Sequence, residues 1–136
     1  MALRIGVGFG GWPFAARDPD LLWEYVDAAE ALDIDSIWLS DRIVSSTLSL
    51  EPLIALSFIA ARTTRMKFGT SVLALPLRNP TVLAKEIATL DFLSGGRALP
   101  AIGLGGHVDC RLTGGRLRLP GDLAARRTIG VPALRF

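Results

Sequence analysis

The stretch KFGTSVLALPLRNPTVLAKEIATLDFLSGGRALPAIGL, residues 67–104, decides the fold class of this chain. It begins with a run of apolar and β-branched residues at 67–75, which predicts a buried strand. Asn79 and Pro80 then predict a helix start, because asparagine caps a first turn and proline at the next position already has a helical φ. A second buried strand is predicted at 98–104, so the stretch forms one strand–helix–strand unit of a parallel sheet.

The same unit recurs toward the N-terminus. Buried strands are predicted at 3–9 and 36–40, and Pro19 and Pro52 predict two more helix starts. Successive strands start roughly 31 residues apart, which suits a (β/α)8 barrel because eight such units make roughly 250 residues. The predicted fold class is therefore α/β: a partial (β/α)8 barrel of about four parallel strands and three helices, with an irregular C-terminal tail. A doubly wound sheet has the same element order and remains the alternative.

Half a barrel leaves surfaces uncovered. The first and fourth strands are expected to have unpaired outer edges, and apolar surface that the other half would cover is expected to be bare. The third helix is expected to bury one apolar stripe. The members of this stripe are Val82, Leu83, Ile87, Leu90 and Leu93.

Composition narrows the class of protein further. The chain has 136 residues, of which half are hydrophobic, and a mean hydropathy of +0.40, which fits one globular domain. Its apolar runs are well short of the 18 or so residues of a membrane helix, and no signal peptide is recognised at the N-terminus. Cys110 is the only cysteine, which excludes an intrachain disulfide and predicts a cytoplasmic protein.

The net charge of the chain changes sign near Gly106. Residues 107–136 hold six arginines, no lysine and two aspartates, whereas residues 1–106 carry a net negative charge. We therefore expect a half-barrel domain at 1–106 and a divergent basic tail at 107–136. The tail also lacks glutamate and periodicity, which is typical of an out-of-frame reading of a GC-rich gene. Its arginines gather on no predictable face and no aromatic residue stands between them, so nucleic-acid binding is not expected.

Chemistry in a parallel βα fold lies at the carboxyl ends of the strands. Asp41 and Arg42 end the second strand, where a carboxylate beside a guanidinium either orients a polar ligand or forms a surface ion pair. The glycines at 103, 105 and 106 end the fourth strand, where they form either an anion-binding nest or a plain turn. No metal site is predicted, because His107 and Cys110 lack partners at metal-ligand spacing.

Residues 6–11 match G-x-G-x-x-G, the dinucleotide-binding pattern. That mechanism needs a helix to start inside the motif, so that the helix N-terminus meets the pyrophosphate. Here the helix is predicted to start only at Pro19. We therefore interpret these glycines as sites of close backbone approach, and Trp38, in the middle of the second strand, as core or barrel lining.

Several segments resemble the bacterial luciferase-like family of flavin-dependent monooxygenases and oxidoreductases that use the deazaflavin coenzyme F-420. Residues 35–41 and 101–105 are similar to its second and fourth strands. The more specific part of the likeness consists of residues 68–76, 78–80, 84–91 and 94–97.

The resemblance implies a barrel that binds FMN or coenzyme F-420 across the carboxyl ends of its strands, together with a small-molecule substrate. It implies a cis peptide bond between Ser71 and Val72 that backs the ring, and homodimers that pack through helices 52–62 and 80–93. Asp41 and Arg42 are then the catalytic candidates. The cofactor-binding candidates are Ser71, Val72, Leu73, Gly103, Gly105 and Gly106.

The likeness covers residues 3–106, so the function expected is that of a truncated flavin- or deazaflavin-dependent oxidoreductase, inactive or weakly active as this fragment. The alternative is a non-catalytic half-barrel that dimerises and binds flavin weakly or not at all. Two residues depart from the family pattern. Arg42 stands where many relatives have a histidine, and arginine cannot act as a base at neutral pH. Pro100 stands inside the fourth strand, where it removes a ladder hydrogen bond.

Overall fold

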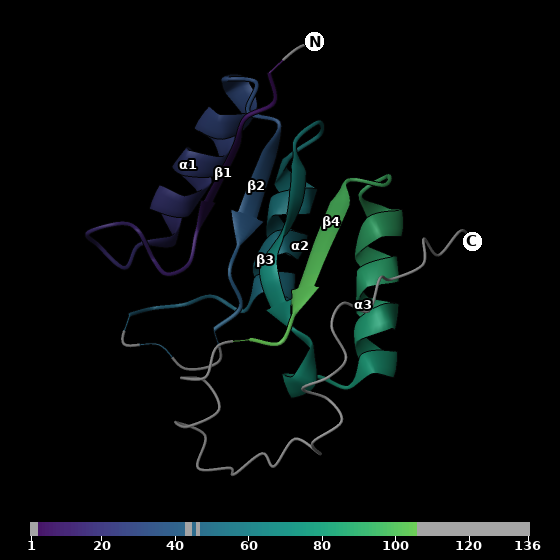
Figure 1. Ribbon diagram of the computed structural model, residues 1–136. Coiled ribbons are helices and arrows are strands. Elements are labelled where there is room, and N and C mark those ends of the chain that lie inside the picture. The colour runs from purple at the N-terminus through teal and green to yellow at the C-terminus, as the bar shows by residue number, and fades with distance from the viewer. Residues whose placement is uncertain (1–2, 43–44, 46, 106–136) are drawn as a thin grey trace.

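The computed structural model describes residues 3–42, 45 and 47–105 (Figure 1). The predicted tail at 107–136 and Gly106 lie outside the described residues. The elements, in chain order, are β1 (Gly6–Phe9), α1 (Pro19–Ala31), β2 (Ser36–Leu39), α2 (Pro52–Arg62), β3 (Lys67–Ala74), the 3-10 turn η1 (Leu75–Leu77), α3 (Pro80–Leu93) and β4 (Ala98–Gly103).

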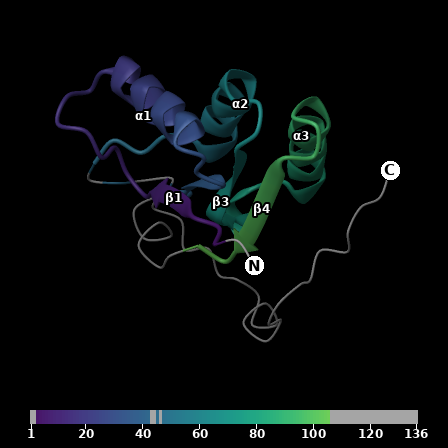
Figure 2. The ribbon, with the colours of Figure 1, turned by 90° about the horizontal axis from the view of Figure 1, so that it is seen from above.

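The strands form one parallel sheet in the order β1-β2-β3-β4. Figure 2 shows that α1, α2 and α3 all lie on the same side of this sheet. A doubly wound sheet has helices on both faces and a strand order that reverses near the first strand, so that alternative is wrong. The predicted partial barrel of four parallel strands and three helices is confirmed.

Each helix begins at the predicted proline, and a side chain caps each first turn. Asp18 accepts a hydrogen bond from the amide of Asp20 at 3.0 Å. Asn79 accepts hydrogen bonds from two amides of the first turn of α3, at 3.0 and 3.2 Å. Glu51 caps α2 by accepting from the amide of Ile54 at 2.7 Å. These caps satisfy amides that have no partner inside a helix.

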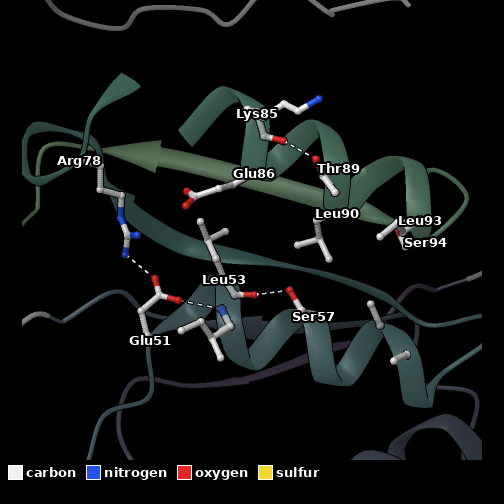
Figure 3. Close-up of a pocket in the computed structure, with 13 residues that line it drawn as sticks. Glu51, Leu53, Ser57, Arg78, Lys85, Glu86, Thr89, Leu90, Leu93 and Ser94 are labelled. Carbon is white, nitrogen blue, oxygen red and sulfur yellow. Dashed lines mark hydrogen bonds and ion pairs between the residues drawn. The ribbon is translucent and has the colours of Figure 1, made fainter. Parts of the chain in front are cut away.

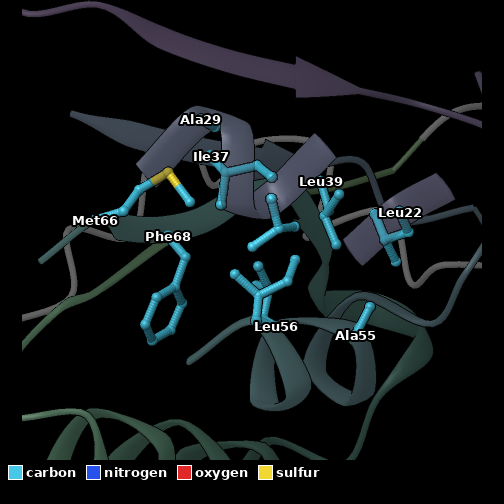
Figure 4. Close-up of a cluster of buried hydrophobic side chains, with 10 residues drawn as sticks. Leu22, Ala29, Ile37, Leu39, Ala55, Leu56, Met66 and Phe68 are labelled. Atoms are coloured by element: carbon cyan, nitrogen blue, oxygen red, sulfur yellow. The ribbon is translucent and has the colours of Figure 1, made fainter. Parts of the chain in front are cut away.

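The core lies between the sheet and the helices α1 and α2 (Figure 4). Ile37 and Leu39 of β2 point into it, together with Phe68 of β3 and Leu56 of α2. Each of these side chains is at most 2% exposed. Because side chains alternate along a strand, Trp38 points to the opposite face of the sheet, which carries no helix among the described residues.

The predicted stripe of α3 is mostly wrong. Only Leu83 is buried, Ile87 and Leu90 are half-buried, and Val82 and Leu93 are 54% and 77% exposed. The reason is position: α3 lies at the β4 edge of the sheet, and within the described residues α2 is its only helical neighbour (Figures 1 and 2). A helix at an edge presents part of its apolar surface to no partner within the described chain.

The outer strands are covered less than the inner ones, as expected for half a barrel. No residue of β1 or β4 is buried, whereas β2 and β3 each have several buried residues. In the part of the chain that the structure describes, no strand pairs with the outer edge of β1 or β4. No helix in these ranges is both long and apolar enough to cross a bilayer.

Candidate functional site

The carboxyl ends of the four strands form one edge of the sheet, which we call the rim and define as residues 10–11, 40–42, 71–74 and 103–105. All the candidate site residues predicted from the sequence lie in it, except Gly106, which is outside the described residues. The arrangement of the candidate residues at the rim therefore determines which ligands and reactions this part of the protein can support.

The third strand bulges where it reaches the rim. Its pairing with β4 runs from Phe68 to Thr70, is interrupted, and resumes at Leu73. The peptide bond between Ser71 and Val72, inside the interruption, is cis, as the family resemblance implies. Both of these side chains are exposed, Val72 by 42%. Leu73 has a fully buried side chain, so only its backbone lies at the rim.

The end of β2 holds the bulge through three hydrogen bonds. The Ser40 hydroxyl donates to the Ser71 carbonyl at 3.1 Å, and the Asp41 amide donates to the Val72 carbonyl at 3.4 Å. The Ala74 amide donates to Asp41 Oδ2 at 3.0 Å. The two residues that follow β2 thus hold the irregular part of β3, where the regular ladder is interrupted.

A threonine connects the bulge to β4 on the other side. Thr70 Oγ1 donates to the Ala101 carbonyl at 2.8 Å and accepts from the Ala101 amide at 3.1 Å. Since N–H groups alternate in direction along a strand, the nitrogen of Pro100 faces the open edge and not β3. Pro100 therefore removes no bond from the sheet that is described, which accounts for a proline inside this strand.

Arg78 is the partner of Asp41, and the sequence analysis missed it. Its Nε and Nη2 atoms lie 3.2 and 3.0 Å from Asp41 Oδ2, and its Nη2 lies 2.7 Å from Glu51 Oε1. The side chains of Asp41, Arg78 and Glu51 are 1%, 16% and 37% exposed. Burial acts to lower the pKa of Arg78, but hydrogen bonds and charges from Glu51 and Asp41 outweigh it and raise that pKa.

Asp41 and Arg42 thus have different environments although they are neighbours in sequence. Asp41 is buried in the ion pair with Arg78, whereas the Arg42 side chain is exposed at the rim. A Cβ atom added at Gly10 would lie 3.3 Å from Arg42 Nη2, so this guanidinium lies over the end of β1. The two residues do not form an ion pair with each other within the described ranges.

Glycines keep the β4 side of the rim open. A Cβ atom at Gly103 would lie 2.6 Å from the Val72 side chain, so only glycine leaves room for Val72 there. Gly105 has a φ of +77°, a conformation that favours glycine, and packs against Ala74. These two predicted cofactor-binding residues therefore adjoin the bulge.

A groove of about 710 Å³ lies between α2 and α3 on the outer side of the sheet (Figure 3). Arg78 and Glu51 lie at one end of this groove, and Leu53, Leu90 and Leu93 are among the residues that line it. Over residues 3–42, 45 and 47–105, no group of three histidine, cysteine or acidic side chains is placed to hold a metal ion.

Comparison with known proteins identifies similar chains. Residues 4–128 match the profile of the family described as luciferase-like monooxygenase, a range that runs past Gly106. The F420-dependent glucose-6-phosphate dehydrogenase of Kineococcus radiotolerans is 37% identical over 108 residues, which cover 76% of this chain and 31% of that protein. The chain therefore spans about a third of the length of the curated relatives it matches.

Solved structures of low sequence identity have the same fold. The F420-dependent tetrahydromethanopterin reductase from Methanopyrus kandleri has a TM-score of 0.69 at 24% identity, over 84% of this chain and 30% of that one. The oxygenating constituent of 3,6-diketocamphane monooxygenase from Pseudomonas putida, in complex with FMN, has a TM-score of 0.69 at 23% identity, over 84% and 33%.

Proposed function

Because the chain belongs to the luciferase-like monooxygenase family, we propose that it supplies the first half of a barrel that binds FMN or coenzyme F-420 across the rim. The proposed activity is a flavin- or deazaflavin-dependent oxidoreduction of a small molecule. The observation that carries the proposal is the bulge of β3, which presents Ser71 and Val72 at the rim beside glycines that add no side chains.

The rim residues fit a flat ring with an anionic substituent. Val72 is exposed, and it packs against Gly103 on one side. Arg42 lies over the end of β1 as an exposed cation, which suits a phosphate. The bound cofactor would supply the redox chemistry. The chain would supply an apolar support from Val72 and a positive charge from Arg42.

Proton transfer is the step that this half of the site is least able to provide. Arg42 stays protonated at neutral pH and so cannot act as a base. Asp41 is buried, and its Oδ2 atom already accepts from Ala74 and Arg78. Because neither candidate residue is free to move a proton, we expect this chain to turn over substrate slowly or not at all by itself.

A second candidate function is a non-catalytic half-barrel that dimerises and binds flavin weakly or not at all. It is favoured by the apolar outer surface of α2 and α3, where Ile54 and Phe58 are 61% and 60% exposed and Leu93 is 77% exposed. Ile54 and Leu93 line the groove between α2 and α3, and exposed apolar side chains around a groove are typical of a protein interface. We propose that homodimers pack through helices 52–62 and 80–93, which is compatible with either function.

The proposed location is the cytoplasm. Cys110 is the only cysteine in the sequence, which suits a reducing compartment.

The proposal is tested by titrating the purified protein with FMN and with coenzyme F-420 while recording the difference spectrum. We expect a saturable change with at least one of them, since the rim would bind the ring even where turnover is absent. Val72→Ser should weaken this binding by about tenfold, because it removes apolar contact area at the ring. Val82→Ser is the control, at a valine of α3 that is 54% exposed against 42% for Val72, and it should bind as the wild type does. A soluble, folded protein with no spectral change would leave the second candidate.

A further inference from the structure

Of the three hydrogen bonds that hold the bulge of β3, one differs from the others because it depends on a charged side chain. Two of them, from Ser40 and from the Asp41 amide, use a hydroxyl and the backbone. The third joins the Ala74 amide to the Asp41 carboxylate, whose side chain is 1% exposed. A carboxylate this deeply buried is costly unless an opposite charge lies beside it.

Arg78 provides that charge, and its own position is fixed from another element. Its Nη2 atom contacts both Asp41 Oδ2 and Glu51 Oε1, at 3.0 and 2.7 Å. Glu51 Oε2 in turn accepts from the amide of Ile54 and caps α2 (Figure 3). One guanidinium therefore connects the start of α2, the end of β2 and the end of β3.

The consequence is a division of roles at the rim. Asp41 Oδ2 accepts from three N–H groups, those of Ala74 and of Arg78 Nε and Nη2, and so lies within the protein and not at its surface. Val72 and Ser71, whose carbonyls are bonded to the same segment of β2, are exposed. The charged pair lies behind the bulge, and the bulge faces outward.

We propose that Arg78 is a positioning residue of the cofactor site, which holds the bulge of β3 in place through Asp41. The proposal rests on the proposed function, because it assigns Arg78 to the support of the same ring-binding rim. It also assigns Asp41 to this support, so that its carboxylate takes no part in proton transfer. Asp41 then has one role, because a carboxylate buried in an ion pair with Arg78 does not also have to accept a proton.

The test compares Arg78→Gln with Arg62→Gln. Arg62 is a matched control, because it forms a forked ion pair with Asp27 at 2.6 and 2.7 Å that is exposed and remote from the rim. The measurements are the Kd for FMN and for coenzyme F-420, and the hydrogen-exchange rate of the Ala74 amide by NMR. We expect Arg78→Gln to raise the Kd by about tenfold or more and to accelerate exchange at Ala74, and Arg62→Gln to change neither.

Two further variants keep the test decisive if Arg78→Gln does not fold. Arg78→Lys keeps the charge but cannot reach both carboxylates with a planar fork, so we expect it to fold and to bind less tightly than the wild type. The double variant with Arg78→Gln and Asp41→Asn removes both charges, so it should recover stability and part of the affinity. A purely structural ion pair would lower stability in the two single variants of Arg78 and leave the Kd of the folded protein unchanged.

The outcomes separate this proposal from the function on which it rests. If the wild type binds a cofactor and Arg78→Gln and Arg78→Lys bind it equally well, the positioning role is wrong and the proposed function stands. If the folded wild type binds neither FMN nor coenzyme F-420, the proposed function is wrong and the positioning role falls with it.

Discussion

Trp38 lies on the face of the sheet that carries no helix, and three glycines make room for it. A Cβ atom at Gly6 would lie 2.8 Å from the Trp38 indole nitrogen, and one at Gly69 would lie 2.7 Å from its benzo ring. A Cβ atom at Gly8 would lie 2.6 Å from the Trp38 carbonyl oxygen and 3.0 Å from the Trp38 Cβ atom. The indole N–H donates to the Ser36 hydroxyl at 3.0 Å, which fixes the ring orientation. The glycine motif at the N-terminus thus serves close approach, and not a nucleotide.

This packing predicts the effect of one methyl group. Gly69→Ala should destabilise the protein by about 3 kcal/mol, because its Cβ would overlap both the Trp38 ring and the Leu99 carbonyl. Gly10→Ala is the control, since its Cβ would meet only the ends of the Ser40 and Arg42 side chains at 3.3 Å. Urea denaturation followed by fluorescence measures both. Equal stability of the two variants would contradict the packing described here.

Glu30 at the opposite end of the sheet organises the chain that leads into β3. Its carboxylate accepts from the amides of Thr64, Arg65 and Met66, at 2.9, 2.8 and 3.0 Å. Burial acts to raise the pKa of Glu30, but these hydrogen bonds outweigh it and hold the pKa below its ordinary value.

The lowered pKa determines how stability depends on pH. The stabilisation is fully present above the pKa of Glu30 in the unfolded chain, about 4.3, and is lost as the pH falls through the lower folded value. Glu30→Gln should therefore cost about 1–2 kcal/mol at pH 7 and progressively less below pH 4. Denaturation curves across this range measure it. Glu24→Gln, at an exposed position of the same helix, is the control and should change stability at pH 7 by less than about 0.5 kcal/mol. A difference for Glu30→Gln that stays constant with pH would contradict the assignment.

At the scale of elements, one hydroxyl bridges the interruption in the pairing of β3 with β4. The regular ladder is interrupted between Thr70 and Leu73, and Thr70 Oγ1 bonds both polar groups of Ala101 in that gap. The Thr70 residue is 1% exposed, so water cannot replace these bonds.

Thr70→Val keeps the shape and removes both hydrogen bonds. We expect a loss of about 1–3 kcal/mol, because the amide and the carbonyl of Ala101, a half-buried residue, both lose their hydrogen-bond partner. Thr89→Val, whose hydroxyl donates to a carbonyl of its own exposed helix, is the control and should change stability by less than about 0.5 kcal/mol. Thermal unfolding of the two variants tests the difference, and a neutral Thr70→Val would show that the bulge needs no side-chain bond.

At the scale of the whole molecule, half of the large apolar side chains that are exposed in the described residues lie on α2 and α3. The proposed homodimer would cover them, and Leu93→Glu should shift the wild-type dimer toward monomer by placing a charge in the groove. Leu32→Glu is closely matched, since Leu32 is 75% and Leu93 is 77% exposed, but Leu32 lies at the end of α1, outside the groove. Sedimentation velocity measures the association. A wild type that stays monomeric at all concentrations, or a dimer that Leu93→Glu does not weaken, would exclude this interface.

Most of the helices and strands can be predicted from the sequence alone, because the sequence features that indicate them are local. Strand periodicity and the caps before Pro19, Pro52 and Pro80 depend on neighbouring residues, and all three helices begin as predicted. The family resemblance identified the cis bond after Ser71, since that segment was specific for the family.

Only the tertiary structure decides which side chains of the site form ion pairs and which are exposed. From the sequence, Asp41 and Arg42 either orient a polar ligand or form a surface ion pair. The partner of Asp41 is instead Arg78, which approaches it only when the ends of β2 and β3 meet. The exposure of Leu93 likewise follows from where α3 stands in the sheet and not from its own apolar pattern. Hydrophobic periodicity and capping act over a few residues of chain, whereas burial and ion pairing depend on which distant segments the fold brings together.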